Sequence, residues 1–172
     1  MISQKMADRI NLQINREMFS AYLYLAMAAK MTNLGYTGIA RWLTVQYHEE
    51  MFHAMKFVRY LEDQAAEVKF DAIAVPAFKE NDPKSLFQHV LEHERWVTAS
   101  IREIMELAMA EKDFATQNLV QWYIDEQVEE EKNAMDILQT IDLLGNTPQG
   151  LFMLNIELGK REPSIPLDYT KI

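Results

Sequence analysis

Hydrophobic positions along this chain recur at spacings of three and four residues, which is the period of an α-helix. Three stretches carry the pattern without a single glycine or proline, at 1–34, 39–75 and 84–144. Because the third stretch is too long for one helix of a globular domain, the three stretches predict four helices. The first lies at about 4–34 and the second at about 37–64. The last stretch holds two helices, from about 84 to a break near Lys112–Asp113, and from there to Leu144.

The residues at the helix ends fit these boundaries. Ser3 is placed to cap the first helix, and Asp82 to cap the third with Pro83 at its first position. Gly145 follows the fourth helix, where glycine commonly ends a helix in the left-handed conformation. The same signals, Thr147 followed by Pro148, predict a short fifth helix at about 148–162 and then a tail at 163–172.

The lengths of the connections predict the topology. The first pair of helices is joined tightly around Gly35 and the last pair around Asp113, so each pair forms an antiparallel hairpin. The connection from Ala65 to Pro83 is long. Fully extended, it reaches about 60 Å, more than the roughly 40 Å of the second helix. We therefore predict an all-α four-helix bundle with one long crossover and a short fifth C-terminal helix.

The predicted fifth helix carries more apolar side chains than a free surface helix would, namely Leu151, Phe152, Leu154 and Leu158. We expect it to pack against another subunit. The chain as a whole, 172 residues and 20.1 kDa, is predicted to form a single domain over 1–172.

Composition narrows the function. The net charge of −9 argues against nucleic-acid binding and favours a protein that attracts cations. The absence of cysteine excludes disulfides, iron–sulfur clusters and zinc-thiolate sites. The N-terminal residues do not resemble a secretory signal, and the longest apolar run, 21–29, is too short for a membrane span. We expect a cytoplasmic protein with no membrane partner.

A carboxylate interrupts the inward-facing stripe of each long helix near its middle: Glu17, Glu50, Glu94 and Glu130. An unpaired carboxylate in a bundle core costs several kcal/mol. These stripes carry no lysine or arginine, so metal ions are the remaining partners. Four carboxylates balance two divalent ions, and they also balance two trivalent ions that share one oxide.

The spacing Glu50-x-x-His53 adds an imidazole one turn from a carboxylate on the same helix face. By itself this spacing is common on solvated helices. Together with a glutamate from each of two other helices it gives most of the di-iron pattern of carboxylate bundles. Oxygen donors with one imidazole suit Fe(II) or Mn(II), and Zn(II) would bind without redox activity.

At this point the chain resembles the ferritins, specifically the prokaryotic non-haem type. The resemblance covers five segments in the family's order: INREMFSAYLYLAMA, YHEEMFHAMKF, HVLEHERW, WYIDEQVEEEKNA and LFMLNIEL. It implies a ferritin-like fold and a ferroxidase centre. One iron would be held by Glu17, Glu50 and His53, and a second by Glu50, Glu94 and Glu130, with Gln127 beside the pair.

The resemblance implies further functional residues. Three glutamates match the ligands of a third iron site and lie one residue off the stripes, half-exposed: Glu49, Glu126 and Glu129. Tyr24 matches a tyrosine beside the centre that binds a ligand carboxylate or supplies an electron. Trp122 matches a tryptophan with a suspected redox role. Without the resemblance, an inward tyrosine or tryptophan is an ordinary core residue.

Two departures bear on the haem-containing relatives. Bacterioferritins carry a second Glu-x-x-His on the fourth helix, where this chain has Gln127-x-x-Glu130, which favours the non-haem type. Met51, however, occupies the position of the bacterioferritin haem ligand, so a haem protein stays an alternative. The other histidines are expected to be exposed: His48, His89 and His93.

The resemblance implies an iron-storage protein with ferroxidase activity. It would bind Fe(II), oxidise it with O2 or peroxide, and mineralise the ferric product inside a homo-oligomeric 24-subunit shell. The alternative is a discrete di-iron oxidase or peroxide scavenger that stores nothing. Rubrerythrin-like proteins are the nearest such case, but they normally add a cysteine-ligated iron domain that this chain cannot form.

Overall fold

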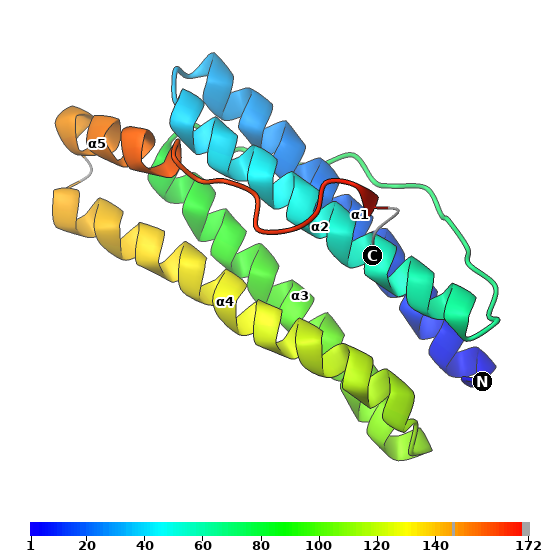
Figure 1. Ribbon diagram of the computed structural model, residues 1–172. Coiled ribbons are helices and arrows are strands. Elements are labelled where there is room, and N and C mark those ends of the chain that lie inside the picture. Colours follow the sequence, from blue (N-terminus) through cyan, green and yellow to red (C-terminus); the bar gives the residue numbers. More distant parts are fainter. Residues whose placement is uncertain (146, 170–172) are drawn as a thin grey trace.

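The computed structural model describes residues 1–145 and 147–169, and five α-helices lie in this part of the chain. They are α1 (Gln4–Asn33), α2 (Thr37–Asp63), α3 (Pro83–Glu111), α4 (Phe114–Leu144) and α5 (Pro148–Leu158). The first four form a bundle in which α1 packs along α2 and α3 along α4 (Figure 1). The predicted all-α four-helix bundle with a short fifth helix is confirmed.

The helices begin and end where the capping residues indicated. The side chains of Ser3, Asp82 and Thr147 each accept a hydrogen bond from a backbone N–H in the first turn of their helix. Lys112 adopts the left-handed conformation, with a φ of 56°, and Asp113 caps the next helix. The chain therefore turns sharply at the predicted break between α3 and α4.

The long connection between α2 and α3 runs the length of the bundle (Figure 1). Asn11 of α1 fastens it: its Nδ2 donates to the carbonyl of Glu67 over 2.9 Å, and its Oδ1 accepts from the N–H of Lys69 over 2.7 Å. The predicted crossover is present, and α1 supplies the polar groups that an irregular backbone segment requires.

The interior of the bundle consists of two apolar clusters with a polar layer between them. One cluster surrounds Met27, Leu43 and Phe87, and the other surrounds Ile10, Phe57 and Ile101. The polar layer contains the buried residues that interrupt the helix stripes: Gln13, Glu17, Ser20, Gln46, Glu49, Glu50, His53, Glu94, Gln127 and Glu130. The apolar clusters stabilise the bundle on both sides of this layer.

Helix α5 ends at Leu158, earlier than the predicted 162. Gly38 and Gly159 approach so closely that a Cβ on Gly38 would lie 1.7 Å from the carbonyl oxygen of Asn155. After this contact the backbone turns, with i→i−3 hydrogen bonds at Lys160 and Arg161 in place of further helix.

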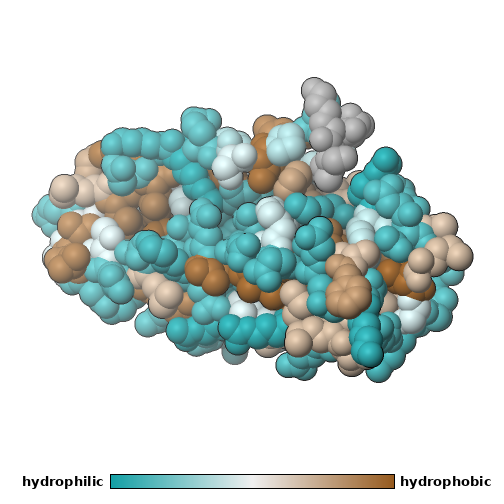
Figure 2. Space-filling view, turned by 60° about the horizontal axis from the view of Figure 1, so that its bottom comes forward, coloured by the Kyte–Doolittle hydropathy of each residue, from teal (hydrophilic) through white to brown (hydrophobic). Residues whose placement is uncertain are grey.

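One side of α5 is already covered within its own chain, because it packs against α2 and α4 and buries Leu151 and Leu154. The expectation that α5 packs on another subunit is therefore wrong for this side. Phe152, Met153 and Ile156 remain exposed on the other side. In Figure 2 apolar side chains gather at the end of the bundle where α5 lies.

Beyond α5 the chain doubles back along α2 (Figure 1). The guanidinium of Arg41 on α2 donates to the carbonyl of Arg161 and pairs with Glu162, and the Tyr169 hydroxyl donates to the carbonyl of His48. The last three residues of the predicted tail, 170–172, lie outside the described residues. Within the described ranges, no helix is both long and apolar enough to span a bilayer.

Candidate metal centre

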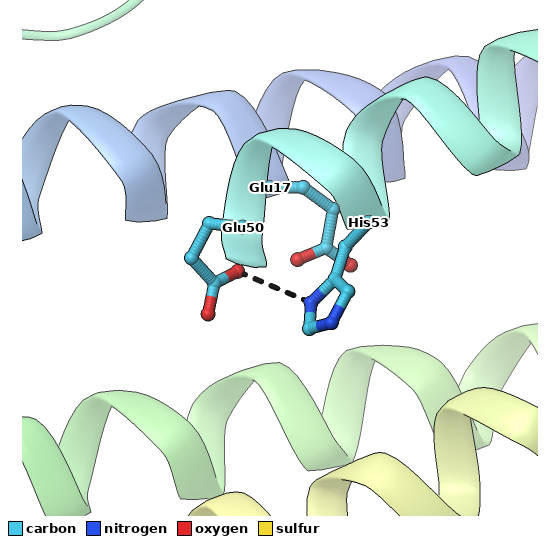
Figure 3. Close-up of side chains that lie close together, drawn as sticks. All are labelled: Glu17, Glu50 and His53. Carbon is cyan, nitrogen blue, oxygen red and sulfur yellow. Dashed lines mark ion pairs between the residues drawn. The ribbon is translucent and has the colours of Figure 1, made fainter. Parts of the chain in front are cut away.

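Glu17 from α1 and Glu50 and His53 from α2 meet in the polar layer. One ligand atom from each lies within 4.8 Å of the others, and all three residues are buried. Figure 3 shows their side chains pointing from α1 and α2 toward α3 and α4. The Glu-x-x-His spacing predicted Glu50 and His53 as neighbouring donors, and the resemblance to the ferritins implied that Glu17 joins them.

Two of these carboxylates have oxygen atoms without a protein partner. Glu17 Oε1 accepts a hydrogen bond of 2.9 Å from Gln13 Nε2. Glu17 Oε2 and Glu50 Oε2 are buried and have no hydrogen-bond partner among the described residues. A buried carboxylate oxygen is costly to leave unpaired. The free oxygens are therefore placed to bind a cation, and the site fits divalent metal ions.

Burial controls the protonation of these carboxylates. The pKa of Glu17 is raised to about 7, chiefly by burial and also by the charge of Glu94, while the hydrogen bond from Gln13 opposes the rise. Burial and the charges of Glu94 and Glu17 raise the pKa of Glu50 well above its usual range. Without metal the centre therefore retains protons near neutral pH, and a bound cation would displace them.

His53 supplies a neutral nitrogen donor. Burial lowers its pKa to about 3, so its contact of 3.6 Å from Nδ1 to Glu50 Oε2 is not a pair of opposite charges at neutral pH. The ring lies against Trp122, with the two ring centres 5.5 Å apart. Tyr123 donates its hydroxyl hydrogen to the carbonyl of His53 over 2.7 Å. The Tyr123 hydrogen bond fixes the backbone at His53, and a neutral imidazole packed against Trp122 is suited to metal binding.

The two remaining predicted ligands, Glu94 and Glu130, are buried in the same layer and face the centre from α3 and α4. They are not part of the tight three-residue group. Tyr24 donates its hydroxyl hydrogen to Glu94 Oε1, and Gln127 Nε2 donates to Glu94 Oε2 over 3.1 Å. Burial raises the pKa of both carboxyls, and the charge of Glu94 adds to the rise at Glu130.

Gln46 belongs to the centre, although no role was predicted for it. Its Nε2 donates to Glu130 Oε2 over 2.8 Å, while its buried Oε1 has no partner among the described residues. Gln13 likewise holds Glu17. Both glutamines lie on the inward stripes one turn before a ligand, so helical periodicity could have identified them.

The three glutamates predicted to flank the centre line one open cavity of about 600 Å³, together with Lys56 and Trp122. Glu126 is half-buried and Glu129 is exposed, as their off-stripe positions predicted. The expectation of a half-exposed Glu49 is wrong: it is 5% exposed, and Arg161 and Ser164 of the tail bind its two oxygens. No periodic signal could have found these partners, because they lie beyond the bundle helices.

The prediction that the other histidines are exposed is also wrong. His93 is buried, and its Nε2 forms a 2.8 Å hydrogen bond with the Ser20 hydroxyl. The apolar stripe of α3 is wide enough to cover the position next to Glu94. His48 and His89 are half-buried, as is Met51.

Comparisons with known proteins agree with this fold and this centre. A family profile described as ferritin-like domain matches residues 7–144. The chain belongs to the ferritin family. It is 38% identical to a bacterial non-heme ferritin of Bacteroides fragilis, over 94% of this chain and 100% of that protein. It is 36% identical to a probable bacterial non-heme ferritin-like protein of Haemophilus influenzae, over 92% of this chain and 96% of that one.

Solved ferritin structures have the same fold. An open-pore ferritin from the archaeon Archaeoglobus fulgidus superposes with a TM-score of 0.92 at 44% identity, over 94% of this chain and 100% of that one. A humanized archaeal ferritin gives a TM-score of 0.93 at 42% identity, over 96% of this chain and 100% of that one. Membership in the ferritin family supports iron storage as the role of this chain.

The shifted pKa values predict how this ferritin responds to pH without metal. His53 and His93, with pKa values lowered to about 3 and 4, make stability rise with pH until their unfolded-state pKa of about 6.5 is passed. Above that pH the raised carboxyl pKa values act alone. Because the folded state then holds more protons than the unfolded state, stability falls as the pH rises.

We therefore expect the melting temperature of the metal-free protein to decrease between pH 6.5 and 8. Each retained proton corresponds to about 1.4 kcal/mol per pH unit. Zn(II), which displaces these protons, should remove the decrease. Thermal melting followed by circular dichroism measures both. A metal-free melting temperature that rises or stays constant over this range would show that the carboxyls are already ionised.

Proposed function

We propose that this chain oxidises Fe(II) to Fe(III) at a two-iron centre in its polar layer and stores the ferric product as a mineral inside a shell of 24 copies. The observation that carries the proposal is the Glu17, Glu50 and His53 group, with buried carboxylate oxygens that lack protein partners, inside a ferritin bundle. No apolar or hydrogen-bonding ligand would compensate these charges as well as a cation.

The donor atoms divide between two Fe(II) ions. Glu17, Glu50 and His53 would bind the first, and Glu50, Glu94 and Glu130 the second, so that Glu50 bridges the pair. Gln127 orients Glu94 through its amide. Two Fe(II) ions balance the four carboxylates and displace the protons that burial retains on them. Each Fe(II) gives up one electron, so the pair reduces O2 to peroxide, or peroxide to water.

Two aromatic residues are placed to assist the oxidation. Tyr24 binds Glu94 directly, and burial together with the charge of Glu94 raises its pKa well above the usual range, so its phenol stays protonated. Trp122 lies against the ring of His53. We assign to Tyr24 the positioning of Glu94, and to both residues the capacity to supply a single electron.

The surroundings of the centre fit the export of iron. Glu49, Glu126 and Glu129 line the cavity of about 600 Å³ beside the centre, where they would form a third, transient iron site. The net charge of −9 favours cations around the chain. The exposed apolar side of α5 offers a contact surface for neighbouring copies in a shell. We propose that the shell forms in the cytoplasm.

The ferroxidase part of this proposal is tested by stopped-flow absorbance with two Fe(II) per chain in air-saturated buffer. The wild-type chain should oxidise both ions far faster than the buffer alone does, and the Glu50→Ala variant should not. Oxidation at the rate of the buffer in the wild type would overturn the proposed ferroxidase activity.

A further inference from the structure

The C-terminal tail, the described segment 160–169 that follows α5, contacts both carboxylate oxygens of Glu49. Arg161 Nη2 lies 2.6 Å from Glu49 Oε2, and the Ser164 hydroxyl donates to Glu49 Oε1 over 3.1 Å. Glu49 lies on α2 one position before Glu50 and off the inward stripe, so the tail reaches the edge of the proposed iron centre. A cation at Glu49 would therefore compete with the positively charged guanidinium of Arg161 for Glu49 Oε2.

The contact between Arg161 and Glu49 is well shielded from water. The two side chains are 19% and 7% exposed, and the guanidinium carbon lies 4.5 Å above the ring of Trp42. The backbone carbonyl of Arg161 accepts a hydrogen bond from Arg41. Burial reduces the screening of this ion pair by water, but it also removes both charged groups from water, which costs free energy.

Within the part of the chain that the structure describes, the guanidinium of Arg161 is not fully hydrogen-bonded in this position. Arg161 Nη1 is buried and has no hydrogen-bond partner among the described residues, so the guanidinium is only partly satisfied. It lines the same open cavity as Glu126 and Glu129. Lys56 also lines the cavity, and its ammonium lies 3.4 Å above the ring of Trp122. The acidic cluster therefore already faces two fixed positive charges.

We propose that the tail is a strap whose Arg161 competes with a metal cation for Glu49. The inference rests on the third iron site proposed above, at Glu49, Glu126 and Glu129. Docking of the strap and binding of the third cation oppose each other, because the guanidinium of Arg161 and the cation are both positively charged and both use the carboxylate of Glu49. By thermodynamic linkage, the docked strap lowers the affinity of the third site for the cation, and the bound cation destabilises docking of the strap by the same factor.

This competition gives the third site a function that three free glutamates would not have. A third Fe(II) or Fe(III) binds only by displacing Arg161, and the returning guanidinium helps to expel it. Arg161 pairs with Glu49 rather than with a proposed ligand of the two central ions, although its charge also acts on Glu130. The strap thus favours transit of iron through the third site over its retention there.

The test compares Mn(II) binding to wild-type protein, Arg161→Ala and Lys160→Ala, with free Mn(II) counted by electron paramagnetic resonance. Lys160 is the matched control: it adjoins Arg161 and carries the same charge, but it pairs with Glu157 on the surface. All three proteins should bind two Mn(II) tightly. The third Mn(II) should bind about tenfold more tightly to Arg161→Ala than to the wild type, and Lys160→Ala should match the wild type.

A second substitution tests whether the third Mn(II) binds at the Glu49, Glu126 and Glu129 cluster. Adding Glu129→Gln to Arg161→Ala should remove the gain if the ion binds at the cluster. Arg161→Lys, which keeps the charge without the two-pronged geometry, should fall between wild type and Arg161→Ala. Equal third-ion affinity in wild type and Arg161→Ala, or an equal gain in Lys160→Ala, would overturn the competition.

Hydrogen exchange gives an independent readout on the wild-type shell. Saturating Mn(II) should speed exchange in peptides covering 160–169, and Glu129→Gln should abolish the change. Unchanged exchange at saturation would contradict displacement of the strap. Loss of the two tight sites in every variant would instead reject the proposed iron centre, so the two failures are distinguishable.

Discussion

Replacing Glu50 by alanine should slow the oxidation of the first two Fe(II) per chain by at least about 100-fold. Glu50 lies in the tight group with Glu17 and His53, and the charges of Glu94 and Glu130 act on it directly. In the proposed centre, Glu50 is the ligand that the two iron ions share. Loss of a supporting residue around a metal costs 10–100-fold in affinity or activity, and loss of a shared ligand should cost more.

The same substitution should leave the fold intact. The apolar clusters on both sides of the polar layer do not include Glu50, and its removal relieves repulsion among buried carboxylates. Glu62→Ala is the matched control, because Glu62 is an exposed glutamate on the same helix, paired only with Arg59 at the surface. An Fe(II) oxidation rate in Glu50→Ala equal to that of Glu62→Ala would sink the assignment of Glu50.

The second large effect is expected for Gly38→Ala, which should detach α5 from the bundle. The new Cβ would lie 1.7 Å from the carbonyl oxygen of Asn155, and backbone atoms cannot yield as a flexible side chain can. The shift would also break the hydrogen bonds from the N–H groups of Gly38 and Ile39 to Asn155 Oδ1. Together these changes should destabilise the protein by about 2–4 kcal/mol.

Thermal melting and hydrogen exchange over 148–158 measure this effect. Thr37→Ala is the control, since Thr37 is the exposed neighbour of Gly38 and already carries a Cβ. Because the strap follows α5 in the chain, Gly38→Ala should also free Arg161 from Glu49. If α5 of the Gly38→Ala variant were protected from exchange as in the wild type, the close contact at Gly38 would not control the docking of α5.

Most of the bundle and the inner half of its metal centre were predictable from the sequence. Helical periodicity and capping residues located α1 to α4, including the break at Lys112–Asp113 between α3 and α4. The carboxylates were detectable because a charge on an apolar stripe is costly unless something compensates it. In the structure Glu17 and Glu50 do lie close together in the core, with His53 beside them.

What the sequence did not predict depends on contacts between distant segments. Gly159 and Gly38 set the end of α5 by their close approach, which no local pattern encodes. The partners of Glu49 come from the tail, more than a hundred residues later in the chain. The hydrogen-bond partner of the buried His93 is Ser20 of α1. In each case the deciding residue lies outside the helix whose pattern was analysed.

The most direct test of iron storage by oxidation at this centre is a count of iron per chain. Excess Fe(II) is added aerobically to the metal-free protein, the mixture is passed over a sizing column, and iron is measured in the protein peak. The account predicts many tens of iron atoms per chain in a peak the size of a 24-subunit shell. Two or three per chain would contradict storage and leave a discrete di-iron oxidase, and no bound iron would contradict the metal centre itself.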